Sequence, residues 1–339
     1  MKLPLVAMTV GDCNGIGPEV LLRSIVQPRI RALCIPVLVG PSSVFEYYGR
    51  TLRRQLPLRE WKGEQDVARQ GIWFVESSDV PEGAIRPGHL SHVAGAAAAA
   101  AITSAARLAL GGFVDAIVTA PVSKQAMHLA GIKAPGQTEM LQELSGSEEV
   151  AMMLVAPHLR VGLVTIHEPL SRVPSLVTER RVVKQTRIVH TALVRDWGIR
   201  RPRIAVLGLN PHAGEGGDIG TEEQRQILPA LEVLRKEGML VDGPFPADGF
   251  FARYAPGVYD AVVAMYHDQG LIPLKMSSGN HAVNVTAGLP LVRTSPDHGT
   301  AFPLAGRGIA DASSMQEAIR LAVTIVLNRR RHARRSARP

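Results

Sequence analysis

Short apolar runs alternate with longer amphipathic stretches along most of this chain. Continuous runs rich in β-branched side chains are typical of strands that are buried on both faces of a parallel sheet. They predict strands at 5–10, 37–39, 116–119, 161–166, 204–208 and 261–265. The stretches between them predict helices at 18–25, 94–110, 179–196, 222–237 and 314–328. This alternation predicts an α/β fold with helices on both faces of a largely parallel sheet.

Composition narrows the class of protein. The chain has 339 residues, of which 46% are hydrophobic and 20% charged, and this excludes intrinsic disorder as its main state. Two cysteines, Cys13 and Cys34, are too few for a disulfide scaffold and fit a reducing compartment. No strongly apolar stretch of 18 residues is free of charge, so we expect no transmembrane helix. The apolar run at the N-terminus is too short for a signal peptide, which favours a cytoplasmic enzyme.

The formal net charge of +8 mostly describes one end of the chain. Six arginines lie in the last eleven residues, and without them the rest carries +2. We therefore expect residues 329–339 to form a basic, disordered tail. An arm that binds nucleic acid or an anionic surface is the alternative, but no aromatic residue lies between these arginines. We expect neither a nucleic-acid partner nor a membrane partner.

Three histidines follow apolar runs at the point where a strand should end. His167, His212 and His267 come after the runs at 161–166, 204–209 and 261–266. Ligands bind beyond the carboxyl ends of parallel strands, so these imidazoles are candidate ligands of a divalent metal. Asp248 and Asp268 are candidates for orienting the imidazoles or for meeting the substrate.

Polar residues also gather in the last third of the chain. Lys275 and Arg293 suit an anionic substrate such as a phosphate or carboxylate, and Asn284 adds a neutral hydrogen-bonding group. Glycines at 299, 306 and 308 suggest a backbone that approaches a ligand closely. The glycine-rich stretches 11–19 and 214–220 lack the spacing of a dinucleotide fingerprint, and the chain contains no P-loop.

Several long motifs give the chain a family resemblance. They are Gly-Asp-Cys-Asn-Gly-Ile-Gly-Pro-Glu (11–19), Val-Asp-Ala-Ile-Val-Thr-Ala-Pro-Val-Ser-Lys (114–124), Asn-Pro-His-Ala-Gly-Glu (210–215), Met-Tyr-His-Asp-Gln-Gly (265–270) and Arg-Thr-Ser-Pro-Asp-His-Gly-Thr-Ala (293–301). With these motifs the sequence resembles the 4-hydroxythreonine-4-phosphate dehydrogenase (PdxA) family of vitamin B6 synthesis and its paralogues. The resemblance runs from Gly11 to about Leu327.

The resemblance implies an architecture and a set of site residues. It implies a two-domain α/β/α fold like isocitrate and isopropylmalate dehydrogenases, with residues 1–125 and 295–328 on the cofactor side and 126–294 carrying metal and substrate residues. It also implies a homodimer whose active sites draw on both chains. The implied metal ligands are His167, His212 and His267, and the implied substrate contacts are Gln137, Thr138, Lys275, Asn284 and Arg293. The implied cofactor loop includes Asp297, His298, Gly299, Thr300 and Gly306.

The implied reaction is hydride transfer from a secondary alcohol of a small anionic hydroxy acid to NAD or NADP. The β-keto acid that results can lose carbon dioxide. A divalent metal, either zinc or else magnesium or cobalt, would stabilise the alkoxide and the later enolate. Lys275 is a candidate base for the alcohol proton, with Asp248 and Asp268 as further candidate catalytic residues.

The chain departs from the family pattern near the expected substrate. Gln137 stands where the family usually has a histidine, and an amide can form hydrogen bonds but cannot carry charge. Cys13-Asn14 and the segment 277–281 also differ from the usual residues. The substrate could therefore be threonate or erythronate 4-phosphate, or a terephthalate-type cis-dihydrodiol dicarboxylate. An acyltransferase of the same broad fold is the alternative from another class of enzyme.

Overall fold

The computed structural model describes residues 2–54, 56–61 and 71–336 and divides into two compact units. Unit 1 comprises residues 1–148 and 289–327, and unit 2 comprises 149–288 and 328–339. The domain boundaries expected from the family resemblance lay at 125 and 294. Each unit contains its own set of strands with helices packed on them, and the predicted metal ligands all belong to unit 2.

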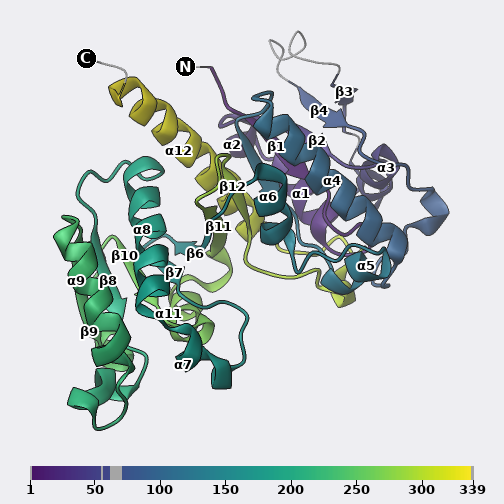
Figure 1. Ribbon diagram of the computed structural model, residues 1–339. Coiled ribbons are helices and arrows are strands. Elements are labelled where there is room, and N and C mark those ends of the chain that lie inside the picture. Colours follow the sequence, from purple (N-terminus) through teal and green to yellow (C-terminus); the bar gives the residue numbers. More distant parts are fainter. Residues whose placement is uncertain (1, 55, 62–70, 337–339) are drawn as a thin grey trace. The chain divides into compact units, whose positions relative to one another are not determined.

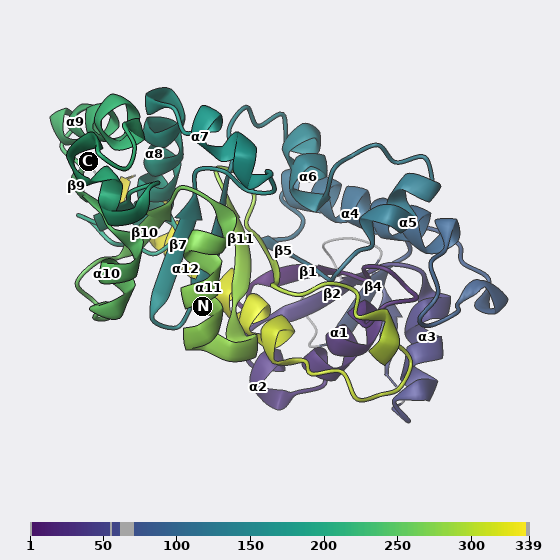
Figure 2. The same ribbon diagram turned by 90° about the horizontal axis from the view of Figure 1, so that it is seen from below.

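Unit 1 contains a parallel sheet with the strand order β3-β4-β2-β1-β5-β12. Its strands are β1 (Leu5–Thr9), β2 (Ile35–Val39), β3 (Leu58–Glu60), β4 (Ile72–Val75), β5 (Ala116–Thr119) and β12 (Arg293–Pro296). Every residue of β1, β2 and β5 is buried, because helices cover both faces of the sheet. Figure 2 shows α4, α5 and α6 on one face and α1, α2 and α3 on the other.

Among the described residues seven α-helices begin in unit 1, and three of them overlap the ranges predicted at 18–25, 94–110 and 314–328. The seven helices are α1 (Gly17–Ile25), α2 (Pro28–Arg31), α3 (Ser42–Thr51), α4 (His92–Leu110), α5 (Lys124–Leu129), α6 (Gln137–Ser145) and α12 (Ser313–Ser336). Helix α4 begins at Ser91, whose side chain accepts a hydrogen bond from the Val93 amide. Its length and apolar composition would suffice to cross a membrane, but half of it is buried. Since α4 packs against β1, β2 and β5, we interpret it as the core helix of unit 1.

Unit 2 contains a mixed sheet with the strand order β11-β6-β7-β10-β8-β9. Its strands are β6 (Ala151–Ala156), β7 (Leu159–Leu163), β8 (Arg203–Leu207), β9 (Leu240–Phe245), β10 (Ala261–Ala264) and β11 (Val283–Ala287). The pairings of β7, β10, β8 and β9 are parallel, but β6 is antiparallel to both of its neighbours. The expectation of a largely parallel sheet is therefore confirmed, with β6 as the exception: a tight hairpin joins β6 to β7, and a two-residue connection requires an antiparallel pair.

Helices cover both faces of the sheet in unit 2 as well. They are α7 (Val173–Leu176), α8 (Glu179–Arg195), α9 (Leu228–Lys236), α10 (Ala247–Ala252) and α11 (His267–Ser278). Figure 2 shows α8 and α9 on one face of the strands and α10 and α11 on the other, and Figure 1 shows α8, α9 and α11 from another side. The helix predicted at 222–237 is present as a continuous helical segment, but it begins with a π-helical turn, Glu223–Ile227, that leads directly into α9. Pro229 has no amide hydrogen for the Arg225 carbonyl, so a regular α-helix cannot run through this point.

The C-terminal segment is ordered where a disordered tail was expected. Helix α12 continues to Ser336, so the prediction is wrong for residues 329–336, whereas 337–339 lie outside the described residues. Arginine is a good helix former, and Arg329 binds the carboxylate of Asp196 through Nε (2.6 Å) and Nη2 (3.1 Å). Arg195 also binds this carboxylate, which is 1% exposed. The tail thus begins with a residue that neutralises a buried acid.

Candidate functional site

The three predicted histidines follow three neighbouring parallel strands of unit 2. In the sheet β10 lies between β7 and β8, and the carboxyl ends of these strands meet at one edge. His167 follows β7, His267 is the first residue of α11 after β10, and His212 follows β8. The predicted placement of the three histidines at one sheet edge therefore matches the strand order.

Two of these imidazoles lie side by side for a local reason. The backbone amide and the hydroxyl of Thr165 both donate to the carbonyl of Met265, at 3.1 and 2.7 Å. This pair fixes the two chain segments two residues before His167 and His267, whose ring centroids are 5.6 Å apart. Asp268 Oδ1 lies 2.7 Å from His267 Nδ1. A carboxylate only accepts, so Nδ1 donates this hydrogen bond, which leaves Nε2 as the ring atom available for a metal.

His212 lies in a loop of unusual conformation. Residues 212–216 all have positive φ, at 53°, 51°, 81°, 41° and 67°, which makes a short left-handed turn. For the residues with a side chain, namely His212, Ala213 and Glu215, this conformation costs about 1–2 kcal/mol each. Other contacts of the loop must offset this cost.

The histidines do not close into a three-ligand group. Among the residues that the structure describes, no set of three or more His, Cys, Asp or Glu side chains is arranged to hold a metal ion. The structure brings His167 and His267 together, while His212 lines a hollow of about 480 Å³ with Asp248 and an aromatic group that includes Phe245 and Tyr254. Paired imidazoles with a carboxylate behind one of them are a donor set that suits zinc or cobalt. The residues present thus fit part of a transition-metal site.

Two other predicted residues of unit 2 lie on α11 and β11. Lys275 is exposed near the end of α11. Asn284 lies in β11, and its Oδ1 is buried without a hydrogen-bond partner. A buried acceptor without a hydrogen-bond partner lowers the stability of the fold. Its presence here fits a residue that accepts a hydrogen bond from a bound ligand.

A buried cation lies in unit 1. The Arg293 side chain is 3% exposed, and its Nε and Nη2 donate to Thr119 Oγ1 at 3.1 and 2.8 Å. Nη2 also lies 3.3 Å from Gln137 Oε1, and Gln137 Nε2 donates to the Ala120 carbonyl at 3.1 Å. Burial lowers the pKa of Arg293 to about 10, so the guanidinium keeps its charge at neutral pH. Thr138 follows Gln137 in the first turn of α6, so three of the predicted substrate contacts lie in unit 1.

The predicted cofactor loop packs against the first glycine-rich loop of unit 1. The amide of Ile16 donates to the Thr300 carbonyl at 2.9 Å. A Cβ at Gly15 would lie 2.9 Å from the Cβ of Thr300, so only glycine permits this approach. Asp12 Oδ2 and His298 Nε2 are buried without hydrogen-bond partners. Two unsatisfied polar atoms on these two loops fit residues that meet a polar ligand.

The rest of the cofactor loop is held by a buried acid. Glu19 is fully buried, and its carboxylate accepts from the amides of Gly308 (3.2 Å) and Ala310 (2.7 Å). A Cβ at Gly306 would lie 2.7 Å from Pro87. The close contact with Pro87 explains the glycine at 306, and the positive φ values of 75° at Gly306 and 69° at Gly308 favour glycine at both positions, in addition to any role in binding.

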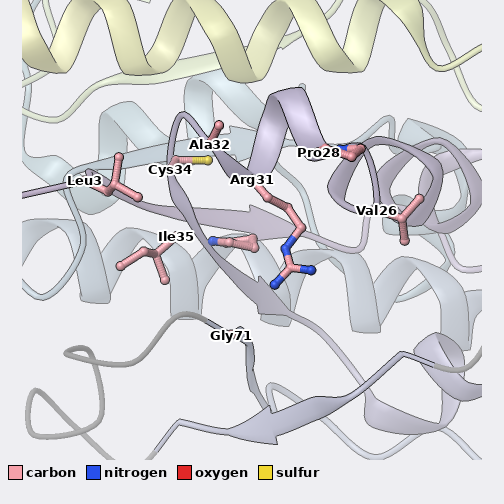
Figure 3. Close-up of a pocket in the computed structure, with 9 residues that line it drawn as sticks. Leu3, Val26, Pro28, Arg31, Ala32, Cys34, Ile35 and Gly71 are labelled. Atoms are coloured by element: carbon pink, nitrogen blue, oxygen red, sulfur yellow. The ribbon is translucent and has the colours of Figure 1, made fainter.

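A further hollow of about 400 Å³ in unit 1 contains none of the predicted site residues. Arg31 extends into it among mostly apolar neighbours, as Figure 3 shows. Cys34 also lines this hollow, and burial raises the pKa of its thiol to about 12. The thiol is therefore protonated at neutral pH and does not act as a nucleophile.

Sequence reasoning missed the polar residues that hold these strand ends together. Gln269 accepts from the Met265 amide at 2.7 Å and donates to the Gly208 carbonyl at 2.6 Å, so it joins the ends of β10 and β8. Its place two residues after His267 was the available signal. Glu223, which is 2% exposed, was also missed.

Comparisons with known proteins identify the family of this chain. The family model of pyridoxal phosphate biosynthetic protein PdxA matches residues 32–322. The chain is 45% identical to a 4-hydroxythreonine-4-phosphate dehydrogenase of Trichlorobacter lovleyi, with 96% of this chain and 98% of the relative covered. It is also 45% identical to a D-threonate 4-phosphate dehydrogenase of Cupriavidus necator, with the same coverage. A crystal structure of a 4-hydroxythreonine-4-phosphate dehydrogenase from Klebsiella pneumoniae is similar at a TM-score of 0.85 and 39% identity, covering 96% of this chain and 98% of that one, and it confirms the predicted fold class.

Proposed function

The chain belongs to the PdxA family of dehydrogenases, and on that premise we propose that it oxidises a small phosphorylated hydroxy acid with NAD or NADP. The substrate would be 4-hydroxythreonine 4-phosphate or a close four-carbon analogue, and oxidation would be followed by loss of carbon dioxide. Membership of a dehydrogenase family makes the chain an oxidoreductase and leaves no support for the acyltransferase alternative. We place the enzyme in the cytoplasm, acting as a homodimer with shared active sites.

One observation carries the proposal beyond family membership. The rings of His167 and His267 lie together at the carboxyl ends of parallel strands, and Asp268 fixes the protonation of one of them. We assign both imidazoles, with His212, to a divalent metal such as zinc. When bound, this ion would supply Lewis acidity for the substrate alcohol. The described residues of one copy do not complete a three-ligand set, and we propose that a second copy of the chain completes it.

Each remaining residue has a role that follows from its own chemistry. In unit 1, Arg293 would bind the anionic group of the substrate, and Gln137 and Thr138 would add neutral hydrogen bonds. In unit 2, the Asn284 Oδ1 would accept a hydrogen bond from the substrate, and Lys275 Nζ would take up the alcohol proton. A nicotinamide cofactor, when bound, would supply the hydride acceptor, so that one hydride from the carbon that bears the hydroxyl and one proton from its oxygen leave the alcohol to form the ketone. We assign Asp297, His298, Gly299, Thr300 and Gly306 to the cofactor and Asp248 to the surroundings of His212.

Two relatives with equal identity leave two substrates to compare. The relatives are named for 4-hydroxythreonine 4-phosphate and for D-threonate 4-phosphate, which differ in the group on the second carbon. Gln137 is neutral, and it stands where the family usually has a histidine. Because Gln137 carries no charge, Arg293 is the cation that would bind the anionic group of the substrate. Both four-carbon phosphates offer such a group, so the threonate is the second candidate.

The test is a substrate panel in which reduction of NAD or NADP is followed by absorbance. We expect turnover with one of the two four-carbon phosphates, carbon dioxide release, and loss of activity after metal removal with recovery on adding zinc or cobalt. Arg293→Met should raise KM for the phosphorylated substrates and leave the metal content of the protein near that of the wild type. Full turnover by protein shown by elemental analysis to lack metal would refute the metal assignment. Failure to reduce either cofactor with any member of the panel would refute the activity.

A further inference from the structure

The left-handed turn that carries His212 is wrapped around one buried carboxylate. Glu223 Oε1 accepts hydrogen bonds from the backbone amides of Leu209 and Asn210, both at 2.7 Å. Its Oε2 accepts from Asn210 Nδ2 at 2.9 Å. Three bonds to one side chain at the start of the turn fix the direction in which the chain leaves β8.

The glycines of the turn leave room for this carboxylate. A Cβ at Gly214 would lie 2.6 Å from Glu223 Oε2, and a Cβ at Gly208 would lie 3.1 Å from Oε1. The Glu223 side chain is 2% exposed, so it is not a solvated surface acid. The backbone of the His212 loop therefore packs directly against this carboxylate, at positions where a side chain in place of glycine would collide with it.

The helix that carries Glu223 is irregular at the same point. Glu223 is the first residue of the π-helical turn Glu223–Ile227, which precedes α9. A π-helical turn adds a residue to a helical segment, and such turns occur frequently at functional sites. The π-helical turn, the buried Glu223 carboxylate and the left-handed loop are therefore parts of one local structure after β8.

We propose that Glu223 is a positioning residue that holds His212 in the orientation required for metal binding. This inference rests on the proposed function, which assigns His212 to the metal. Glu223 touches neither substrate nor cofactor in this role, and acts through the backbone of Leu209 and Asn210. A carboxylate is needed because only an acceptor on both oxygens can satisfy the two amides and the Asn210 side chain together.

The neighbouring acid provides a matched control. Glu222 also accepts from Asn210 Nδ2, at 2.8 Å, but it is partly exposed, and the backbone bonds to its carboxylate come from Thr221 and from Glu222 itself, outside the left-handed turn. Glu223→Gln places an NH2 group against the loop donors, whereas Glu222→Gln makes the same chemical change one residue away. Both variants lose one negative charge, so a difference between them reports the buried contacts.

The first measurement needs no metal. Hydrogen exchange by mass spectrometry, on peptides covering 205–217, should show faster exchange in Glu223→Gln than in the wild type or Glu222→Gln. The second measurement is titration with Co²⁺, followed by its visible absorption. We expect the dissociation constant to rise about 10- to 100-fold in Glu223→Gln, the range found when groups behind metal ligands are removed, and to stay near the wild-type value in Glu222→Gln.

The outcomes separate this inference from the proposed function. Equal exchange in the two variants, or equal Co²⁺ affinity, would overturn the role of Glu223. If the wild type binds no Co²⁺, the metal assignment fails, and the exchange data still decide whether Glu223 orders the loop. If Glu223→Gln does not fold, Asn210→Ala removes only the side-chain bonds and should weaken Co²⁺ binding in the same direction.

Discussion

Asp12 should destabilise the folded protein at neutral pH, and a single substitution should relieve that cost. The Asp12 side chain is 1% exposed, and its Oδ2 has no hydrogen-bond partner. Burial raises the pKa of Asp12 from 3.8 to about 6, although amides such as that of Asn14 (2.9 Å from Oδ1) favour the charged form. Asp12→Asn keeps the acceptor for Asn14 and removes the buried charge.

The magnitude follows from the shift in pKa. Between about pH 4 and 6 the folded state binds more protons at Asp12 than the unfolded state, so stability falls as pH rises through this window. A shift of this size corresponds to about 3 kcal/mol at pH values above 6. At about pH 4.5 the cost shrinks to about 1 kcal/mol, because the carboxyl is then largely protonated in the folded protein.

The assay is urea unfolding of wild type and Asp12→Asn at about pH 4.5 and pH 7.5. We expect Asp12→Asn to be more stable at both values, with a gain about 2 kcal/mol larger at the higher pH. Glu82→Gln, which breaks an exposed pair with Arg50, is the control and should change stability by less than about 1 kcal/mol. A gain that is equal at both pH values, or a loss at pH 7.5, would refute the argument that the charge of Asp12 is desolvated.

Three further perturbations test other parts of the structure. Gln137→His should place a neutral imidazole beside Arg293, since a protonated ring could not accept the hydrogen bond that the Arg293 guanidinium donates. The ratio of the two KM values, for 4-hydroxythreonine 4-phosphate and threonate 4-phosphate, should then change. Gly95→Ala should destabilise the protein by about 2 kcal/mol or more in urea unfolding, because the new Cβ would lie 2.1 Å from the Ala126 carbonyl oxygen. Arg329→Ala should cost about 2–4 kcal/mol by the same assay, because the buried aspartate that it binds keeps only one arginine.

A different result would contradict each of these three predictions. An unchanged substrate ratio in Gln137→His would show that this position does not set specificity. A Gly95→Ala protein as stable as the wild type would contradict the close crossing of α4 and α5. Arg334→Ala, on the exposed side of α12, is the control for Arg329→Ala, and equal losses in the two variants would mean that the ion pair with Asp196 contributes nothing.

The local pattern of the sequence determined much of the fold. The runs at 5–10 and 116–119 became fully buried strands, since continuous apolar stretches can be satisfied only where both faces of a sheet are covered. The same pattern placed His167 and His267 directly after strands. It also identified a family whose solved members share this fold.

Other features depend on partners far away in the chain. Nothing near Arg329 in the sequence shows that it binds Asp196, so its segment was expected to be disordered. The place of β6 between β7 and β11 depends on its pairing with β11, which lies more than 120 residues later. Hydrophobic periodicity reports which side of an element is buried, but it carries no information on which strand lies beside it.

The candidate site shows the same division between sequence and tertiary structure. The sequence alone determined that three histidines lie at strand ends and that a glycine-rich loop follows β8. Only the tertiary structure decided that two of the rings are neighbours and that His212 lies on a left-handed turn held by Glu223. The physical reason is that a buried carboxylate can stabilise an unfavourable backbone conformation only where folding brings the amides of another segment to it.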